Sequence, residues 1–136
     1  MSDASGRMLP ALTPLNEFFW TSGADGRLRV QRCRACGRFG HPPAPVCRSC
    51  FSSDLEAAPV SGRGRVYTFT VNRQAWSERL TDPYVIAIVE LAEQPGLRLL
   101  TDIVGCAPAD VHVGMPVEVV FEHDDDVYLP LFRPSA

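Results

Sequence analysis

A helix-like pattern of hydrophobic residues lies near the start of the chain. Leu15, Phe18 and Phe19 recur at i, i+3, i+4 spacing, which places them on one side of a helix. Thr13 is a suitable N-cap for this helix, and Gly23 is a suitable end. We therefore expect one short helix between these two residues, with an unusually aromatic face.

Trp20 extends this aromatic surface beyond the strict helical stripe. One interpretation is that Phe18, Phe19 and Trp20 pack against the rest of their own domain. The other is that the three rings form a docking surface for a partner protein, because a small core does not require so wide an aromatic surface. The sequence leaves both interpretations open.

Strands are predicted on both sides of a proline-rich stretch. Residues 27–32 alternate, with Leu28 and Val30 on one side, and residues 55–60 form a second strand-like run. Three of the four residues 42–45 are proline. Since proline cannot donate a ladder hydrogen bond, we do not expect regular pairing there.

Five strand-like runs follow the glycine-rich segment 61–64, which indicates a domain boundary. They cover residues 65–73, 84–91, 97–104, 116–122 and 127–132. In the first run, Tyr67, Phe69 and Val71 fall on one side of the strand. Five strands in about 70 residues, with one longer connection at 105–115, favour a small closed barrel over a two-sheet sandwich.

These elements divide the chain into three expected parts. Residues 1–12, rich in small residues and proline, are predicted to be a flexible lead-in. Residues 13–60 contain the helix and a cysteine-rich region, and residues 61–136 contain the barrel. The expected fold class is therefore mainly β.

Four of the five cysteines have the spacing of a metal site. They are Cys33, Cys36, Cys47 and Cys50, in the pattern C-x2-C-x10-C-x2-C. Each C-x2-C pair can form a tight turn that presents two thiolates, and four thiolates at tetrahedral geometry suit zinc. Because the protein supplies all four ligands, no position remains open for water or substrate, and we predict a structural zinc ion. Iron, or an empty reduced site, is the alternative.

The two cysteine turns differ in the residue that follows them. Gly37 follows the first pair, where the chain can turn back with positive φ, whereas Phe51 occupies that place after the second pair. The sequence therefore predicts a less tightly wound second turn. A segment of about 30 residues buries too little apolar surface to fold alone, so metal binding is expected to supply much of its stability.

Composition indicates a folded protein with an uneven distribution of charge. Hydrophobic residues make up 46% of the chain and charged residues 21%. All 13 basic residues are arginine, and residues 27–79 hold ten of them against three acids, whereas residues 80–126 hold one against ten acids. The net charge of −3 therefore hides stretches of opposite sign.

The chain shows no apolar run of about 18 residues and no signal-peptide pattern, so we expect a cytoplasmic protein without a membrane segment.

Other candidate residues for chemistry are weak. Cys106 stands alone near a strand end, where a small buried residue is more common than a nucleophile. His41, His112 and His123 are scattered, and none is at helical spacing from a second histidine or a carboxylate. No phosphate-binding loop or dinucleotide fingerprint is present. We therefore predict no catalytic residue in the chain, and a small enzyme that uses Cys106 is the least favoured alternative.

The arginine-rich stretch raises the question of nucleic-acid binding. Tyr67, Phe69 and Trp76 lie near arginines, as on barrels that bind single strands by stacking and phosphate contacts. The acidic residues of 80–126 would repel a long polyanion, however. A compact phosphate-bearing ligand or an acidic partner surface suits these arginines at least as well, and we expect no nucleic-acid partner.

Several short motifs occur together along the chain. They are Phe18-Phe19-Trp20, Leu28-Arg29-Val30, Cys36-Gly37, Pro42-Pro43 and Ser61-Gly62-Arg63-Gly64, followed by Pro83-Tyr84-Val85, Val104-Gly105-Cys106, Val113-Gly114-Met115-Pro116 and Leu129-Pro130-Leu131-Phe132. On these residues, roughly 14–133 of the chain resembles the zinc-ribbon/OB-fold family of acyl-CoA-associated proteins, long catalogued only as a domain of unknown function. The resemblance implies a rubredoxin-like zinc ribbon followed by a five-stranded OB-fold barrel.

The resemblance also implies a function as an accessory subunit. Members of this family pair with thiolase-superfamily enzymes, which supply the catalytic residues, and help to form the site or channel for the coenzyme A (CoA) thioester. The expected partner is a lipid-transfer-protein-like aldolase that cleaves steroid-CoA side chains, or a thiolase, in a hetero-oligomer. A stand-alone module that binds acyl-CoA or single-stranded nucleic acid is the alternative. On this resemblance, Arg38, Arg63, Arg65 and Arg73 are candidate CoA contacts, and Phe18, Phe19 and Trp20 are candidate partner contacts.

Overall fold

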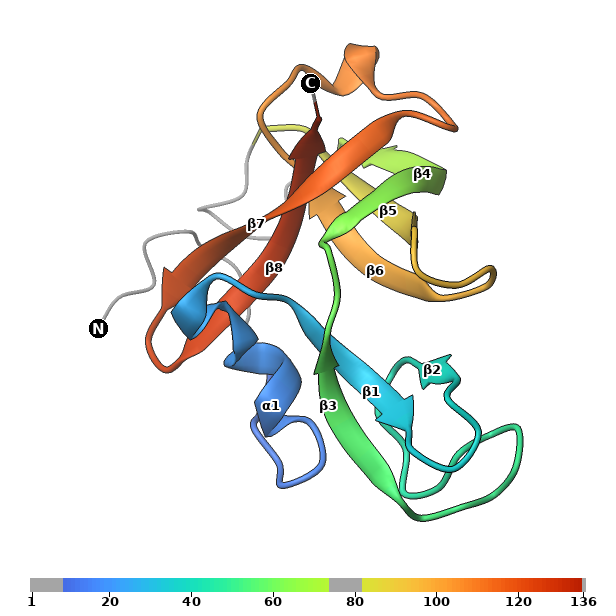
Figure 1. Ribbon diagram of the computed structural model, residues 1–136. Coiled ribbons are helices and arrows are strands. Elements are labelled where there is room, and N and C mark those ends of the chain that lie inside the picture. The colour runs from blue at the N-terminus through green and yellow to red at the C-terminus, as the bar shows by residue number, and fades with distance from the viewer. Residues whose placement is uncertain (1–8, 74–81, 136) are drawn as a thin grey trace.

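The computed structural model describes residues 9–73 and 82–135, which form a small three-stranded sheet beside a closed barrel (Figure 1). Residues 1–8 of the predicted lead-in and Trp76 lie outside the described residues. Within the described ranges, no helix has the length and hydrophobicity needed to cross a membrane.

The N-terminal part contains two short helical turns and three strands. They are α1 (Glu17–Trp20), the 3-10 helix η1 (Ser22–Asp25), β1 (Arg29–Cys33), β2 (Phe39–Gly40) and β3 (Leu55–Pro59). The three strands pair antiparallel in the order β2-β1-β3. The predicted alternation before the cysteines is confirmed, because Leu28 and Val30 are 1% and 0% exposed.

The predicted helix exists, but its boundaries differ from those expected. Thr13 caps a separate turn, in which its Oγ1 accepts the Asn16 N–H at 3.2 Å while the Asn16 side chain accepts the Thr13 N–H at 2.8 Å. α1 begins only at Glu17. The prediction that Gly23 ends the helix is wrong, because Gly23 lies inside η1, and the left-handed residue that follows η1 is Gly26, with φ of 79°. Gly23 is instead a point of close approach, since a Cβ there would overlap the Phe121 ring.

The C-terminal part is a closed five-stranded barrel, as predicted. Its strands are β4 (Arg63–Asn72), β5 (Tyr84–Leu91), β6 (Arg98–Ile103), β7 (Pro116–Asp124) and β8 (Val127–Pro134), with the 3-10 helix η2 (Pro108–Asp110) between β6 and β7. The order is β4-β5-β6-β8-β7, and β7 pairs with β4 to close the barrel. Among the described strands, only β6 and β8 pair in parallel. This is the topology of an OB-fold.

One predicted strand face is wrong, because β4 contains a β-bulge. The register of β4 against β5 shifts between Val66 and Thr68. Val66 is 1% exposed and points into the barrel, whereas Tyr67 is 47% exposed and points outward. Phe69 and Val71, beyond the bulge, are the partly buried residues that pack against the core. A bulge adds one residue to a strand, so the alternation that places Tyr67 with Phe69 does not hold across it.

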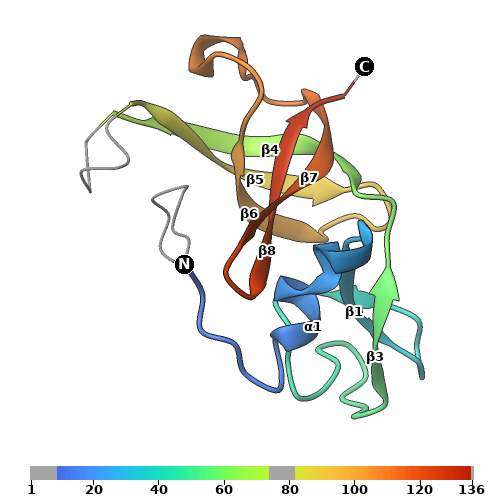
Figure 2. The ribbon, with the colours of Figure 1, turned by 90° about the vertical axis from the view of Figure 1, so that its left-hand side faces the viewer.

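The helix, the ribbon sheet and the barrel share one hydrophobic core. Phe19, Leu28 and Val30 belong to the same buried cluster as barrel residues such as Val89 and Phe132. α1 contacts both β8 and β1, and it lies between the end of the β7–β8 hairpin and the ribbon strands (Figure 2). The ribbon is therefore packed firmly against the barrel, and the division of the chain at residue 60 stays a prediction.

Candidate metal centre and arginine groove

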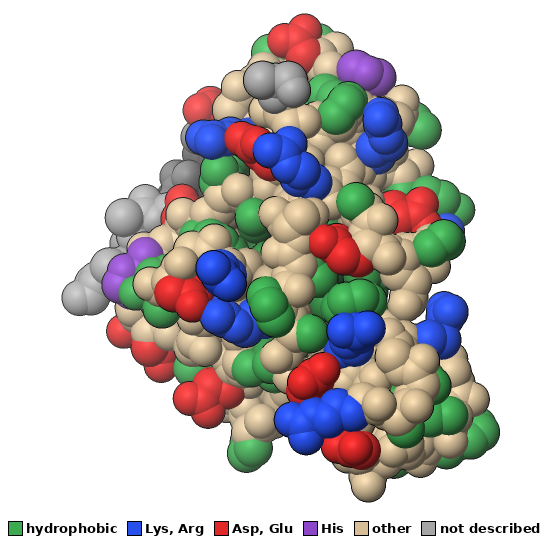
Figure 3. Space-filling view, in the orientation of Figure 1, with side chains coloured by type: hydrophobic (Ala, Val, Ile, Leu, Met, Phe, Trp, Pro, Cys, Tyr) green, Lys and Arg blue, Asp and Glu red, His purple; other side chains and the backbone are tan. Residues whose placement is uncertain are grey.

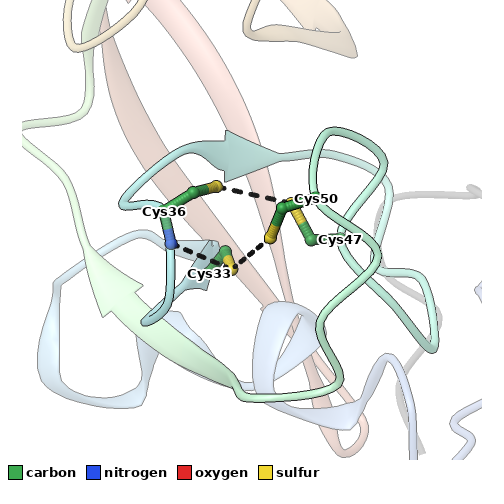
Figure 4. Close-up of side chains that lie close together, drawn as sticks. All are labelled: Cys33, Cys36, Cys47 and Cys50. Carbon is green, nitrogen blue, oxygen red and sulfur yellow. Dashed lines mark hydrogen bonds between the residues drawn. The ribbon is translucent and has the colours of Figure 1, made fainter.

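The four cysteines of the predicted metal site converge on one point (Figure 4). Their Sγ atoms all lie within 4.8 Å of one another. The Cys33–Cys50 and Cys36–Cys47 Sγ pairs are each 3.6 Å apart. Zinc–sulfur bonds of about 2.3 Å at tetrahedral angles place sulfurs roughly 3.8 Å apart, so four thiols in this arrangement fit a zinc ion.

Two knuckles with the same hydrogen bonds present these cysteines. The Gly37 N–H donates to the Cys33 carbonyl at 2.8 Å, and the Phe51 N–H donates to the Cys47 carbonyl at 2.9 Å. Gly37 has φ of 81° and Phe51 has φ of 66°, so both residues adopt the left-handed conformation. The prediction of a looser turn at Phe51 is therefore wrong. The knuckle imposes its geometry on a residue that adopts it at a cost.

The backbone of each knuckle favours the thiolate form that a metal requires. Donation from the N–H groups of Cys50 and then Ser49 lowers the pKa of the Cys47 thiol to about 6. The pKa of Cys33 is also lowered, chiefly by the Cys36 N–H, which lies 3.4 Å from the sulfur. Hydrogen bonds to the charged form lower a pKa, so the sulfurs of Cys33 and Cys47 are prepared for a cation. The pKa of Cys50 moves the other way, to about 12: the Ser52 N–H lowers it, but the hydrogen bond with the Cys33 thiol and burial raise it more.

A groove on the barrel brings two of the four candidate arginines together. It has a volume of about 440 Å³ and is lined by Arg63 and Arg65 of β4, by Glu90 of β5 and by the β5–β6 turn. Arg65 donates to the Gly114 carbonyl at 3.0 Å, which holds the side chain in place and leaves its other N–H groups available. Both arginines are exposed. The groove therefore offers two guanidinium groups to an anion.

The other two candidate arginines lie elsewhere. Arg38 lines a smaller cavity of about 190 Å³, between the ribbon and the β5–β6 turn, together with Arg48. Arg73 follows the far end of β4, about 30 Å along the strand from Arg63 at the usual rise per residue. The four arginines therefore do not form a single cluster.

Acidic neighbours reduce the charge contrast expected from the sequence. Arg34 lies 3.4 Å from Asp54 and 3.3 Å from Glu56, and other pairs are Arg29–Asp25 at 2.7 Å and Arg133–Glu118 at 3.0 Å. Basic and acidic side chains are interspersed on the face in Figure 3. The barrel register also sets Arg63 beside Glu118 and Arg65 beside Glu90. Folding therefore mixes the two stretches of opposite charge, and the arginine groove is local.

The aromatic residues before the ribbon lie partly in the core and partly at an apolar groove. Phe19 is 4% exposed, while Phe18 and Trp20 are partly buried against the core. A groove of about 550 Å³ is lined by Trp20 together with residues such as Pro42, Ile88 and Leu100. Leu100 is 74% exposed. The alternation along β6 sets it on the same face as Arg98 and Asp102, a signal in the sequence that was missed. The role of Phe18, Phe19 and Trp20 as partner contacts stays a prediction.

The remaining candidates for chemistry lie in separate settings. Burial, followed by the charge of Asp110, raises the pKa of Cys106, which lowers its thiolate fraction at neutral pH. His112 Nδ1 lies 3.3 Å from the Asp110 carbonyl, and His123 stacks on Tyr128 with ring centroids 4.0 Å apart. None of these contacts is that of an activated nucleophile and its base.

Comparison with known proteins decides the family. Residues 20–56 match the family described as "ChsH2, rubredoxin-like zinc ribbon domain", and residues 57–122 match "ChsH2, C-terminal OB-fold domain". In a solved structure described as "Ltp2-ChsH2(DUF35) aldolase", one chain is 39% identical and superposes with a TM-score of 0.84, over 94% of this chain and all of that one. The chain belongs to the ChsH2/DUF35 family. Its zinc-ribbon and OB-fold domains are those of this family.

Curated relatives of this ChsH2/DUF35 chain carry several enzymatic names. It is 40% identical over 96% of its length to a "Probable enoyl-CoA hydratase alpha subunit" of Thermomonospora curvata, and 36% identical over 98% to the "3-oxo-4,17-pregnadiene-20-carboxyl-CoA hydratase alpha subunit" of Mycobacterium tuberculosis. The chain spans only 40% and 42% of these two relatives. It is also 30% identical, over 91% of its length and 88% of the relative, to "Benzoylsuccinyl-CoA thiolase subunit BbsA" of Thauera aromatica.

Proposed function

We propose that this chain is a non-catalytic subunit that pairs with a thiolase-superfamily enzyme acting on CoA thioesters. The similarity to the chain of the "Ltp2-ChsH2(DUF35) aldolase" is the observation that carries the proposal, because it extends over all of that chain. Relatives named as subunits of acyl-CoA enzymes support the same class of assembly. Within this class, the leading reaction is retro-aldol cleavage of a steroid-CoA side chain, with a thiolase reaction as the alternative partner chemistry.

The proposed role of this subunit is to help bind and position the CoA part of the thioester. CoA carries a 3′-phosphate and a diphosphate, and planar guanidinium groups bind phosphate oxygens by charge-assisted hydrogen bonds. Arg63 and Arg65, which face one groove, are the arginines best placed for such contacts. Arg38 and Arg73 remain candidates at separate positions. Holding the thioester in register would raise its effective concentration at the catalytic residues of the partner.

A hydratase complex is a second candidate function. Two of the curated relatives are named as hydratase alpha subunits, and one of these names specifies a pregnadiene carboxyl-CoA. The chain corresponds to less than half of each relative, so the hydratase activity of those proteins can reside in the part that this chain does not match. We therefore favour an aldolase or thiolase partner.

Calorimetric titration of CoA into the complex tests the proposed CoA site. Arg63→Ala and Arg65→Ala should each weaken CoA binding about tenfold, since a hydrogen bond to a charged group contributes roughly 1.5–3 kcal/mol. Arg27→Ala is the matched control, because Arg27 is an exposed arginine of the ribbon part and does not line the groove. Equal affinities in all three variants would remove the arginine groove from the CoA site.

A further inference from the structure

A glutamine on the turn between β5 and β6 joins the barrel to the ribbon. The Phe39 N–H of β2 donates to Gln94 Oε1 at 2.9 Å, and Gln94 Nε2 donates to the Phe39 carbonyl at 3.0 Å. The two residues are 55 positions apart in the sequence. The side-chain amide of Gln94 thus satisfies the outer edge of β2 in the way that a neighbouring strand would.

The position of Phe39 depends on the first cysteine knuckle. Phe39 is three residues beyond Cys36, and the carbonyl of the intervening Arg38 accepts the Cys33 N–H at 2.9 Å. β2 has only two residues, which pair with Gln31 and Arg32 of β1. The Gln94 amide therefore supplies a substantial part of the hydrogen bonding that holds β2.

The same turn forms a wall of the arginine groove. Ala92, Gln94 and Pro95 line the groove together with Arg63 and Arg65. The Ala92 N–H donates to the Arg63 carbonyl at 3.0 Å. On its other side, Gln94 lines the smaller cavity beneath the ribbon. A displacement of this turn therefore changes the space in front of the two guanidinium groups.

We propose that Gln94 is a positioning residue that couples the metal centre to the arginine groove. The closed knuckle fixes β2, β2 fixes the Gln94 amide, and the amide fixes the turn that walls the groove. By thermodynamic linkage, a ligand in the groove stabilises the metal centre by the same factor by which the metal strengthens ligand binding. The identity of the groove ligand rests on the proposed function, whereas the link between Gln94 and the ribbon does not.

Release of zinc from the complex with the partner enzyme to a chromophoric chelator, with and without CoA, tests this coupling. Gln94→Met removes both hydrogen bonds at similar size, and Gln94→Asn keeps the amide but shortens its reach. Both variants should release zinc about tenfold faster than the wild type, because two partly buried hydrogen bonds are lost. Saturating CoA should slow release about fivefold in the wild type, and less than about twofold in the variants.

Glu93→Gln is the matched control on the same turn. Glu93 Oε2 accepts the Ser61 N–H at 2.7 Å, and a glutamine oxygen can accept the same bond, so this variant should release zinc at the wild-type rate. Wild-type release rates in both Gln94 variants would overturn the proposal. So would an equal effect of CoA in the wild type and the variants, which is the result for a purely structural residue. If CoA does not bind the wild-type complex, the proposed CoA site fails, and the release rates without CoA still decide whether Gln94 holds the ribbon.

Discussion

Phe51 occupies a backbone conformation that glycine adopts more easily, so Phe51→Gly is predicted to tighten metal binding. With φ of 66°, Phe51 carries the left-handed strain of a residue with a Cβ, which costs roughly 1–2 kcal/mol. Glycine adds about 0.5–1 kcal/mol of unfolded-state entropy. The ring is 75% exposed, so its removal loses little packing. The net gain is about 0.5–1 kcal/mol, or roughly a two- to fivefold tighter apparent zinc affinity.

Gly37 provides the opposite change in the matching knuckle. Its φ is 81°, and a Cβ there would meet only Arg32 Nη2 at 3.7 Å, an ordinary contact. Gly37→Ala therefore tests the backbone conformation without a steric clash, and it should weaken zinc binding by a similar two- to fivefold. Competition against a chromophoric zinc chelator measures both variants. Weaker binding by Phe51→Gly, or tighter binding by Gly37→Ala, would refute the reasoning.

Three further predictions concern the ribbon and the barrel. Cys36→Ser should abolish stoichiometric zinc binding and unfold the ribbon. The barrel strands should stay paired but melt at a lower temperature, because Leu28 and Val30 pack in the core that the ribbon shares with the barrel. A variant with full zinc content and native amide shifts around the ribbon would contradict this. Gly64→Ala should lower the free energy of unfolding, measured by thermal melts, by about 2–3 kcal/mol. The new Cβ would overlap the Glu90 carbonyl oxygen and lie 2.9 Å from Val89 Cγ1. An unchanged melting temperature would count against the close packing of β4 on β5. Burial, and then the charge of Arg48, lowers the pKa of His41 to about 4, so the folded state stays neutral while the unfolded state takes up a proton below pH 6.5. Stability should therefore fall by about 3 kcal/mol from pH 6.5 to pH 4 relative to His41→Phe, and parallel unfolding curves for the two proteins across this range would exclude the effect.

The fold could be predicted from the sequence wherever a local pattern determines the structure. The cysteine spacing predicted the ribbon, and five strand-like runs, two of them clearly alternating, predicted the barrel strands. The face of Tyr67 was mispredicted because a bulge is decided by pairing with a neighbouring strand, which the single strand does not reveal. Phe51 was mispredicted because the sulfur geometry of the knuckle overrides the conformational preference of one residue.

The groove could be predicted only in part, because it depends on contacts between distant residues. The arginine-rich stretch was evident, but the sequence could not show that Arg63 and Arg65 share a groove while Arg38 and Arg73 lie apart. Gln94 gave no signal at all. Its partner lies 55 residues away, and a glutamine in a turn is usually a solvated side chain.

Activity of the reconstituted complex tests the central claim most directly. Three samples would be prepared: this chain alone, a thiolase-superfamily partner alone, and the two proteins produced together. The molecular mass of each sample and its rate of cleavage of a steroid-CoA thioester would be measured. The account predicts a hetero-oligomer of defined stoichiometry, with full turnover only when both proteins are present and none from this chain alone. Turnover by the isolated chain, or two proteins that elute separately while the partner alone is fully active, would contradict it.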